Sequence, residues 1–184
     1  MPLITIKKPE FDAEIDIKYA SSDNFTGAAV YKNAKCLLHP DAASALQIAI
    51  AIAKPLGLRF LIFDAFRPSE AQWKLWQHTP DPNFLADPAK GSPHSRGVAI
   101  DLNLIDASGN QLDMGTAFDE FTPLSHHGRT DISTEAQKNR LLLMGIMTTA
   151  GWDFYRNEWW HYQLFNSKEY KVLSDIDAES DMIY

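Results

Sequence analysis

Two short stretches of the sequence carry the residue types of a metal centre. The first places His94 seven residues before Asp101, and the second holds Glu158 and His161 in an aromatic segment. Two histidines and one aspartate meet the needs of a catalytic zinc site, which uses three protein ligands and leaves a fourth position for water. The remaining carboxylate, Glu158, could then take the proton from that water as a general base.

Each of these residues alone also has an ordinary structural explanation. Asp101 lies in an apolar run, Val98 to Ile105, that alternates like a strand with one strongly buried face. A nearby arginine or backbone amides could satisfy a carboxylate there. His161 could be a hydrogen-bonded core histidine beside two tryptophans. The two segments complete one ligand set together, which favours the metal site over these alternatives.

The spacing within each stretch limits where the ligands can lie. His94 and Asp101 are an odd number of residues apart, so in one unbroken strand their side chains would face opposite sides. We therefore expect His94 in a loop before the strand, with Gly97 allowing an unusual turn between them. The same parity separates Glu158 from His161, so we expect Glu158 at the start of a strand that contains His161.

Helix and strand signals alternate along the rest of the chain. A proline in the first turn and two capping-box patterns, which start at Ser69 and Thr134, mark the beginnings of helices. The expected helices are 39–53, 69–76 and 134–150, and the expected strands are 58–66, 98–105 and, more weakly, 14–18. A turn is expected at 106–110. We predict one α+β domain, residues 1–184, with a central antiparallel sheet flanked by helices.

Composition and charge exclude several classes of protein. The chain has a formal net charge of −7 and no basic run, which argues against nucleic-acid and anionic-membrane partners. The single cysteine, Cys36, excludes an internal disulfide and a cysteine-rich zinc finger. The first residues lack the apolar segment and the small-residue cleavage site of a secretory signal, so we expect none, and no apolar run is long enough to cross a membrane. These features predict a cytoplasmic protein.

The two metal-site stretches also carry a family resemblance. Ser-x-His-x-x-Gly-x-Ala-x-Asp, followed by Glu-x-x-His, resembles the pattern of the zinc D-alanyl-D-alanine dipeptidases, the type associated with vancomycin resistance. Further stretches that resemble this family are Lys18-Tyr19-Ala20, Asp23-Asn24-Phe25-Thr26-Gly27, Phe63-Asp64-Ala65-Phe66-Arg67-Pro68, Met114-Gly115, Phe118-Asp119 and Ser125-His126-His127. The matches run from about residue 14 to 165. The resemblance implies the fold that these enzymes share with D,D-carboxypeptidases and Hedgehog signalling domains.

Carried over position by position, the resemblance implies a role for eight residues. The implied zinc ligands are His94, Asp101 and His161, with Glu158 as general base and then proton donor, and Arg67 as the group that stabilises the oxyanion. Tyr19 and Asp119 would hold the ammonium group of the substrate, and Ser92 would help to bind its carboxylate. His126 and His127 receive no ligand role, because three ligands and water complete the site.

The expected function is zinc-dependent hydrolysis of the dipeptide D-alanyl-D-alanine, a small-molecule substrate. One alternative is a D,D- or L,D-carboxypeptidase that trims peptidoglycan peptides, which needs an open groove and usually export. Another is a zinc-binding module of the same fold without activity. The presence of both Glu158 and Arg67 argues against that module, because a purely structural zinc site needs neither. Residues 167–184 carry no functional signal.

Overall fold

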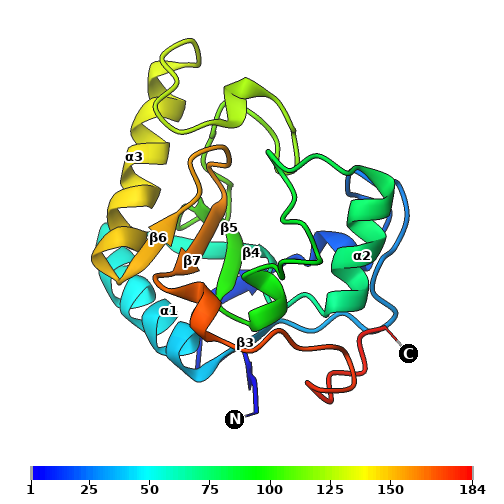
Figure 1. The fold of residues 1–184 in the computed structure, drawn as a ribbon. Coiled ribbons are helices and arrows are strands. Elements are labelled where there is room, and N and C mark those ends of the chain that lie inside the picture. The colour runs from blue at the N-terminus through cyan, green and yellow to red at the C-terminus, as the bar shows by residue number, and fades with distance from the viewer. Residues whose placement is uncertain (1, 184) are drawn as a thin grey trace.

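A five-stranded sheet crosses the middle of the molecule. In the computed structural model, which describes residues 2–183, the strand order is β2–β4–β5–β7–β6. Figure 1 labels β4, β5, β7 and β6. The strands are β2 (Ala13–Ile15), β4 (Arg59–Asp64), β5 (Ala99–Ile105), β7 (His161–Leu164) and β6 (Trp152–Phe154). β2 pairs with β4 in parallel, and the other neighbours are antiparallel. The predicted α+β class and central antiparallel sheet are confirmed, with one parallel pair at the edge.

A second, two-stranded sheet joins β1 (Ile4–Thr5) to β3 (Leu37–Leu38). The sequence did not predict these strands, because two-residue strands carry no periodic pattern. The predicted turn at 106–110 forms, with the backbone N–H of Asp106 donating to the carbonyl of Asn110 at 2.9 Å. It is followed by a single bridge between Ile105 and Gln111.

The three α-helices lie close to their predicted positions. They are α1 (Pro40–Ala53), α2 (Ser69–His78) and α3 (Thr134–Thr149). Neither predicted capping box forms. Ser133, one residue earlier than expected, caps α3 by accepting the N–H of Ala136 at 3.0 Å, and α2 begins after Pro68 without a side-chain cap. Extended backbone angles at Ser133 and Pro68 move both helix starts away from the patterns in the sequence.

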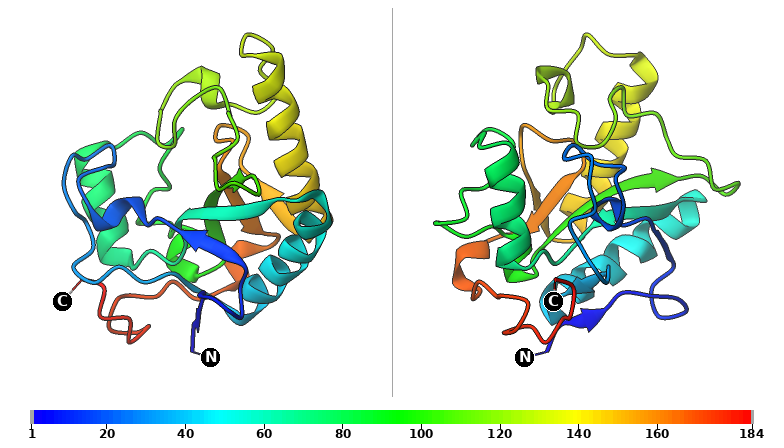
Figure 2. Two further views of the ribbon diagram at one scale, coloured as in Figure 1. Left: turned by 180° about the vertical axis from the view of Figure 1, so that it is seen from behind. Right: turned by 90° about the vertical axis from the view of Figure 1, so that its right-hand side faces the viewer.

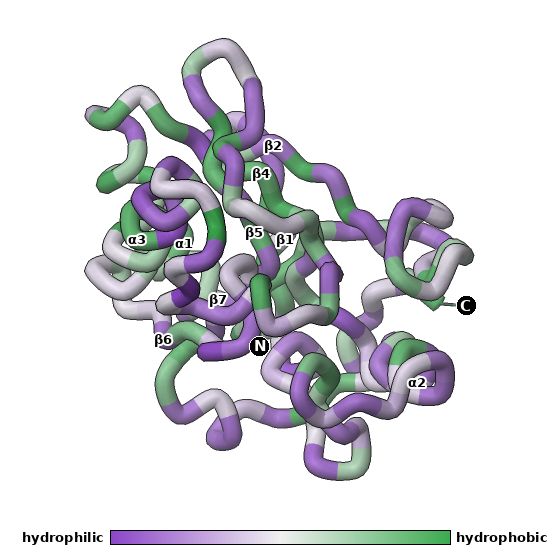
Figure 3. The backbone as a smooth tube through the Cα atoms, turned by 90° about the horizontal axis from the view of Figure 1, so that it is seen from above, coloured by the Kyte–Doolittle hydropathy of each residue, from purple (hydrophilic) through white to green (hydrophobic). Residues whose placement is uncertain are grey.

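The helices cover the sheet unequally. α1 and α3 lie together on one side of it, whereas α2 and long loops lie on the other side (Figures 1 and 2). All seven residues of β5 are buried, so both faces of this strand are covered rather than one. Hydrophobic segments run through the strands in the middle of the molecule, as Figure 3 shows. No helix within residues 2–183 is long and apolar enough to cross a membrane.

Strand register brings three polar side chains into one row. Asp64 on β4 pairs with Asp101 on β5, and Asp101 pairs with His161 on β7. Directly opposed residues of antiparallel strands point to the same face of the sheet. An irregularity between Ile62 and Asp64 shifts the register of β4 and brings Asp64 into this row. The row lies on the face opposite the aliphatic side chains of β5.

Candidate active site

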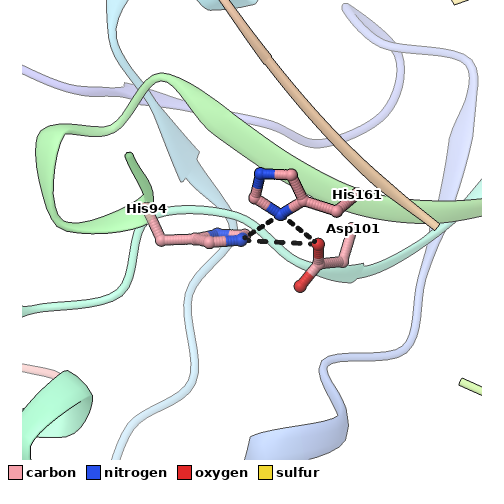
Figure 4. Close-up of side chains that lie close together, drawn as sticks. All are labelled: His94, Asp101 and His161. Atoms are coloured by element: carbon pink, nitrogen blue, oxygen red, sulfur yellow. Dashed lines mark hydrogen bonds and ion pairs between the residues drawn. The ribbon is translucent and has the colours of Figure 1, made fainter. Parts of the chain in front are cut away.

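His94, Asp101 and His161 converge on one point at the face of the sheet (Figure 4). His94 Nε2 and His161 Nδ1 are 3.1 Å apart. Asp101 Oδ1 lies 3.1 Å from His161 Nδ1 and 3.4 Å from His94 Nε2. All three residues are buried. The structure therefore brings together the three ligands that the sequence predicted from separate segments.

The hydrogen bonds of the two imidazole rings show which nitrogens are free to bind a cation. His94 Nδ1 lies 2.7 Å from the carbonyl oxygen of Ala65, so this nitrogen donates its proton there. His161 Nε2 lies 3.1 Å from Oε1 of Gln163, which accepts its proton. With these partners, the remaining ring nitrogens carry lone pairs that face each other and the Asp101 carboxylate. Three acceptors without a shared donor are the arrangement that a metal cation stabilises.

The spacing of the three atoms also fits a metal ion. Zinc binds histidine nitrogen and carboxylate oxygen at about 2.0–2.2 Å, which gives a tetrahedron with edges of about 3.3–3.6 Å. The three separations in the structure are 3.1, 3.1 and 3.4 Å. The site is thus close to the size that a tetrahedral ion requires.

A short turn before β5 holds His94. His94–Arg96 form a 3₁₀ turn, as expected for a ligand outside the strand, and Gly97 follows with a φ of 68°. The positive φ favours glycine at this position, and a Cβ atom there would also lie 2.9 Å from the end of the Leu3 side chain and 3.2 Å from the backbone nitrogen of His39. The turn lets His94 reach the same point as Asp101, despite their odd separation in sequence.

Glu158 lies in the turn before β7, rather than at the start of the strand as predicted. β7 begins at His161, so this predicted metal ligand is the first residue of the strand. The Trp159 backbone N–H donates to the Ser125 carbonyl at 3.1 Å, which ties this turn to the preceding loop. Glu158 is 5% exposed, and its Oε2 lies 3.9 Å from His161 Nδ1. The carboxylate is therefore next to the metal-binding triad without belonging to it.

Arg67 approaches the triad from the end of β4. Its Nε and Nη2 lie 2.9 and 2.8 Å from Oδ2 of Asp64, and its Nη2 lies 3.5 Å from Oδ2 of Asp101. Tyr31 donates a hydrogen bond of 2.9 Å to the other oxygen of Asp64. The guanidinium is 5.0 Å from the centre of the Tyr19 ring. Arg67 is thus a buried, fixed cation beside the triad.

Tyr19 and Asp119 form the pair that the sequence predicted for an ammonium group. The Tyr19 hydroxyl donates to Oδ2 of Asp119 at 3.0 Å, and its ring is buried. Asp119 adopts a φ of 59°, which is uncommon for a residue other than glycine. The left-handed backbone turns its carboxylate toward Tyr19 and the cavity.

All eight predicted site residues border one cavity of about 220 Å³. The Ser92 hydroxyl accepts the backbone N–H of His94 at 3.2 Å, and among residues 2–183 its own proton has no acceptor. Aromatic and apolar side chains complete the walls: Phe84, Leu85, Phe121, Tyr155 and Trp160. Phe84 stacks on Phe121 with 4.9 Å between ring centres. The cavity is polar at the triad and apolar away from it.

The cavity concentrates negative charge. Burial, and then the charge of Asp101, raises the pKa of both Glu158 and Asp119 well above the ordinary values. Burial alone would also raise the pKa of Asp101, but in the metal-free site the rings of His94 and His161, when protonated, outweigh burial and hold that pKa below its usual range. A divalent cation at the triad would favour the ionised form of each of these acids.

Comparison with known proteins places the chain in a family. Residues 3–177 match the model of the peptidase M15 family, described as D-ala-D-ala dipeptidase. The chain belongs to this family. It is 50% identical to the D-alanyl-D-alanine dipeptidase of Escherichia coli (strain K12), over 89% of this chain and 85% of that protein. It is 34% identical to the D-alanyl-D-alanine dipeptidase of Enterococcus faecalis (strain ATCC 700802 / V583), over 82% and 85%.

A Streptomyces coelicolor protein with the same name is 34% identical, over 81% of this chain and 84% of that protein. The chain is therefore a peptidase of the M15 family, and His94, Asp101 and His161 form a possible metal-binding triad within it.

Several residues around the site have no sequence motif of their own. Gln163 lies two residues after His161, so the alternation of a strand predicts that both face the same side. Tyr31 contacts Asp64, and Gln72 contacts Arg67, but nothing in the sequence indicates either contact. His126 and His127 are outside the triad. His127 packs against Phe154 and its backbone N–H donates to the Arg156 carbonyl.

The C-terminal segment also contributes to the surroundings of the site. Its Leu173 N–H donates to the carbonyl of Ser95 at 2.8 Å, beside His94. The Leu173 carbonyl accepts the N–H of Ser69, the first residue of α2. This segment therefore supports the turn that holds His94, a role that the sequence did not indicate.

Proposed function

We propose that this protein hydrolyses the free dipeptide D-alanyl-D-alanine, with zinc held by His94, Asp101 and His161. The observation that carries the proposal is the convergence of three lone-pair atoms at 3.1–3.4 Å, with Glu158 and Arg67 at the same cavity. The names of the relatives in E. coli, E. faecalis and S. coelicolor support the choice of substrate. The family match over residues 3–177 supports a single catalytic domain.

Zinc, when bound, would polarise the peptide carbonyl and lower the pKa of a water molecule. The chain supplies the proton transfers. Glu158 is close enough to the triad to accept the proton of the attacking water and to pass it to the leaving amine. Burial raises the pKa of Glu158, and a cation at the triad would counter this effect and favour the ionised form that accepts a proton.

Arg67 would stabilise the negative charge that develops on the carbonyl oxygen. The guanidinium has five N–H groups. Its Nε–H donates to Asp64 and one Nη1–H donates to Gln72, while Nη2 is ion-paired with Asp64 at 2.8 Å and with Asp101 at 3.5 Å. The second N–H of Nη1 remains for a substrate oxygen. A fixed, permanently charged donor in a buried site stabilises an oxyanion more than a mobile one does, because it needs no reorganisation during the reaction.

Charge and size both favour a free dipeptide. Four carboxylates, Asp64, Asp101, Asp119 and Glu158, face one guanidinium at the site. Together with the guanidinium, a divalent ion and the ammonium group of a substrate would neutralise these four carboxylates, and the substrate carboxylate would add one further negative charge at the other end of the dipeptide. The cavity of about 220 Å³ is also smaller than the roughly 300–1,000 Å³ typical of sites for drug-sized ligands.

The two ends of the dipeptide would be recognised separately. Asp119 and Tyr19 would bind its ammonium group, and the unused hydroxyl proton of Ser92 would bind its carboxylate. Because both termini of a dipeptide are charged, a site that contacts both rejects longer or blocked peptides.

A substrate panel tests the proposal. Zinc content is measured together with hydrolysis of D-Ala-D-Ala, L-Ala-L-Ala, N-acetyl-D-Ala-D-Ala and a tripeptide that ends in D-Ala-D-Ala. We expect zinc and rapid cleavage of D-Ala-D-Ala alone. Equal cleavage of the acetylated dipeptide would favour the carboxypeptidase function, and zinc without any cleavage would favour a binding module.

A further inference from the structure

Gln72 lies directly behind Arg67 and outside the cavity. It belongs to the first turn of α2 and is 1% exposed. Its Oε1 accepts a hydrogen bond of 2.9 Å from Nη1 of Arg67, and its Nε2 donates one of 2.8 Å to the carbonyl of Ala86. Both ends of a buried amide are therefore used, one on the proposed oxyanion donor and the other on a residue that lines the cavity.

The chemistry of the two partners fixes the orientation of this amide. Arg67 offers only donors, and the Ala86 carbonyl is only an acceptor. The amide must therefore point its oxygen to Arg67 and its nitrogen to Ala86. A carboxylate at position 72 has no proton to give to Ala86, and an aliphatic side chain would leave both partners without a hydrogen bond.

Gln72 supplies a point of attachment that Asp64 does not. Nε and Nη2 of Arg67 both contact the same oxygen, Oδ2 of Asp64, at 2.9 and 2.8 Å. Because both nitrogens meet one oxygen of Asp64, and Nη2 is held by Asp101 only at 3.5 Å, the guanidinium can pivot about that oxygen, unlike a bidentate pair with two separate oxygens. The hydrogen bond from Nη1 to Gln72 gives a second fixed point and removes this freedom.

The Ala86 end of Gln72 belongs to a loop that spans the cavity. This loop contributes Phe84, Leu85 and Ala86 to the lining. On its other side, the carbonyl of Asn83 accepts hydrogen bonds from Tyr155 Oη at 2.8 Å and from the Asn157 side chain, next to Glu158, at 3.1 Å. The loop thus has anchors on both the Arg67 and the Glu158 sides of the site.

We propose that Gln72 is a positioning residue that fixes the guanidinium of Arg67 against the cavity wall by bonding Arg67 and Ala86 at once. This inference rests on the role of Arg67 in the proposed function. Gln72 touches neither the cavity nor the triad, so it acts on catalysis through Arg67. Its loss should lower kcat and leave metal binding and KM nearly unchanged.

Gln72→Met tests the proposal, because methionine keeps the length and volume of the side chain without either hydrogen bond. We expect kcat for D-Ala-D-Ala to fall about 10- to 100-fold, as for misplacement of a charged catalytic donor. Zinc content should be retained. Gln77→Met, at an exposed position on the same helix, is the matched control and should keep the unmodified rate.

A double-mutant cycle separates positioning from a purely structural role. If Gln72 acts through Arg67, Gln72→Met should have little further effect on kcat in an Arg67→Ala background. If Gln72→Met lowers kcat equally in both backgrounds, or in neither, the inference is overturned. In that case a slow Arg67→Ala variant would still support the proposed function. A fully active Arg67→Ala protein would refute both.

Gln72→Glu provides a second variant if the methionine protein folds poorly. Glutamate keeps an oxygen acceptor for Arg67 and loses the donor for Ala86, so it should retain more of kcat than methionine does. A Gln72→Glu protein that is slower than Gln72→Met, with its zinc retained, would contradict positioning of Arg67 by the oxygen of this side chain.

Discussion

Asp101 and His161 lie directly opposite each other on β5 and β7, with Oδ1 and Nδ1 3.1 Å apart. Two residues sixty positions apart in sequence thus share one face of the sheet through strand register. The register fixes two of the three proposed metal ligands on rigid backbone. His94 is the third, and it reaches them from a short turn that Gly97 makes possible.

The first prediction concerns these ligands. His94→Ala, Asp101→Ala and His161→Ala should each lose zinc and activity together, because three ligands are the minimum for a catalytic zinc site. Elemental analysis and D-alanine release from the same samples measure both. His78→Ala, on the exposed end of α2, is the control and should keep both. Full zinc retention in the His161→Ala protein would remove His161 from the ligand set.

The second prediction separates chemistry from metal binding. Glu158→Gln should keep the zinc, because the triad is intact, and should slow hydrolysis by about 10²–10⁴-fold through loss of the proton acceptor. Glu169→Gln, at an exposed position, is the matched control. A Glu158→Gln protein that binds zinc and turns over at the unmodified rate would show that another group is the base.

The third prediction concerns the geometry of Arg67. Arg67→Lys keeps a positive charge but loses the planar fork, so it should slow hydrolysis by about 10²-fold with zinc retained. Steady-state kinetics should show the loss in kcat rather than in KM. Unmodified turnover by the lysine variant would mean that charge alone suffices, and that the orientation set by Asp64 is unimportant for catalysis.

The fourth prediction is a pH dependence of stability without metal. The folded pKa of Asp119 is raised well above its ordinary value of 3.8, first by burial and then by Asp101. Above pH 3.8 the unfolded chain releases this proton while the folded chain keeps it, so Asp119 lowers stability increasingly as pH rises toward the folded pKa.

Asp119→Asn should therefore stabilise the chelator-treated protein, by an amount that is near zero below pH 3.8 and grows with pH. Asparagine also tolerates the positive φ at this position, so the substitution adds little backbone strain. Urea unfolding between pH 3.5 and 7.5 measures the difference. An advantage that stays constant across this range would show that the carboxyl group does not titrate differently in the folded state.

Much of the site could be predicted from the residue types of the candidate ligands and from whether their separations in the sequence are odd or even. The residue types of His94, Asp101 and His161 predicted a metal site, and the structure brings these three residues together; their spacing placed His94 before the strand, where a short turn holds it. The proline and the capping-box patterns placed the three helices close to their observed positions, although the caps themselves were misplaced because Ser133 lies outside the capping-box pattern. Local sequence is sufficient where a property depends on neighbours within one or two helical turns.

Long-range contacts set the features that the sequence did not predict. The parallel pairing of β2 with β4 and the sheet of β1 with β3 depend on residues far apart in the chain. The same is true of Gln72, whose partner Ala86 lies in a loop without periodic pattern. Asp64 belongs to a stretch that resembles the family, but only the irregular register of β4 shows that it faces Arg67.

A zinc titration is the most direct test of zinc-dependent hydrolysis of D-Ala-D-Ala by this protein. Protein stripped of metal by a chelator is titrated with zinc while release of D-alanine from D-Ala-D-Ala is followed. We predict negligible hydrolysis without metal, and activity that rises to a plateau at about one zinc per chain, because one triad would hold one ion. Full activity in the stripped protein, or no D-alanine at any zinc concentration, would contradict this prediction.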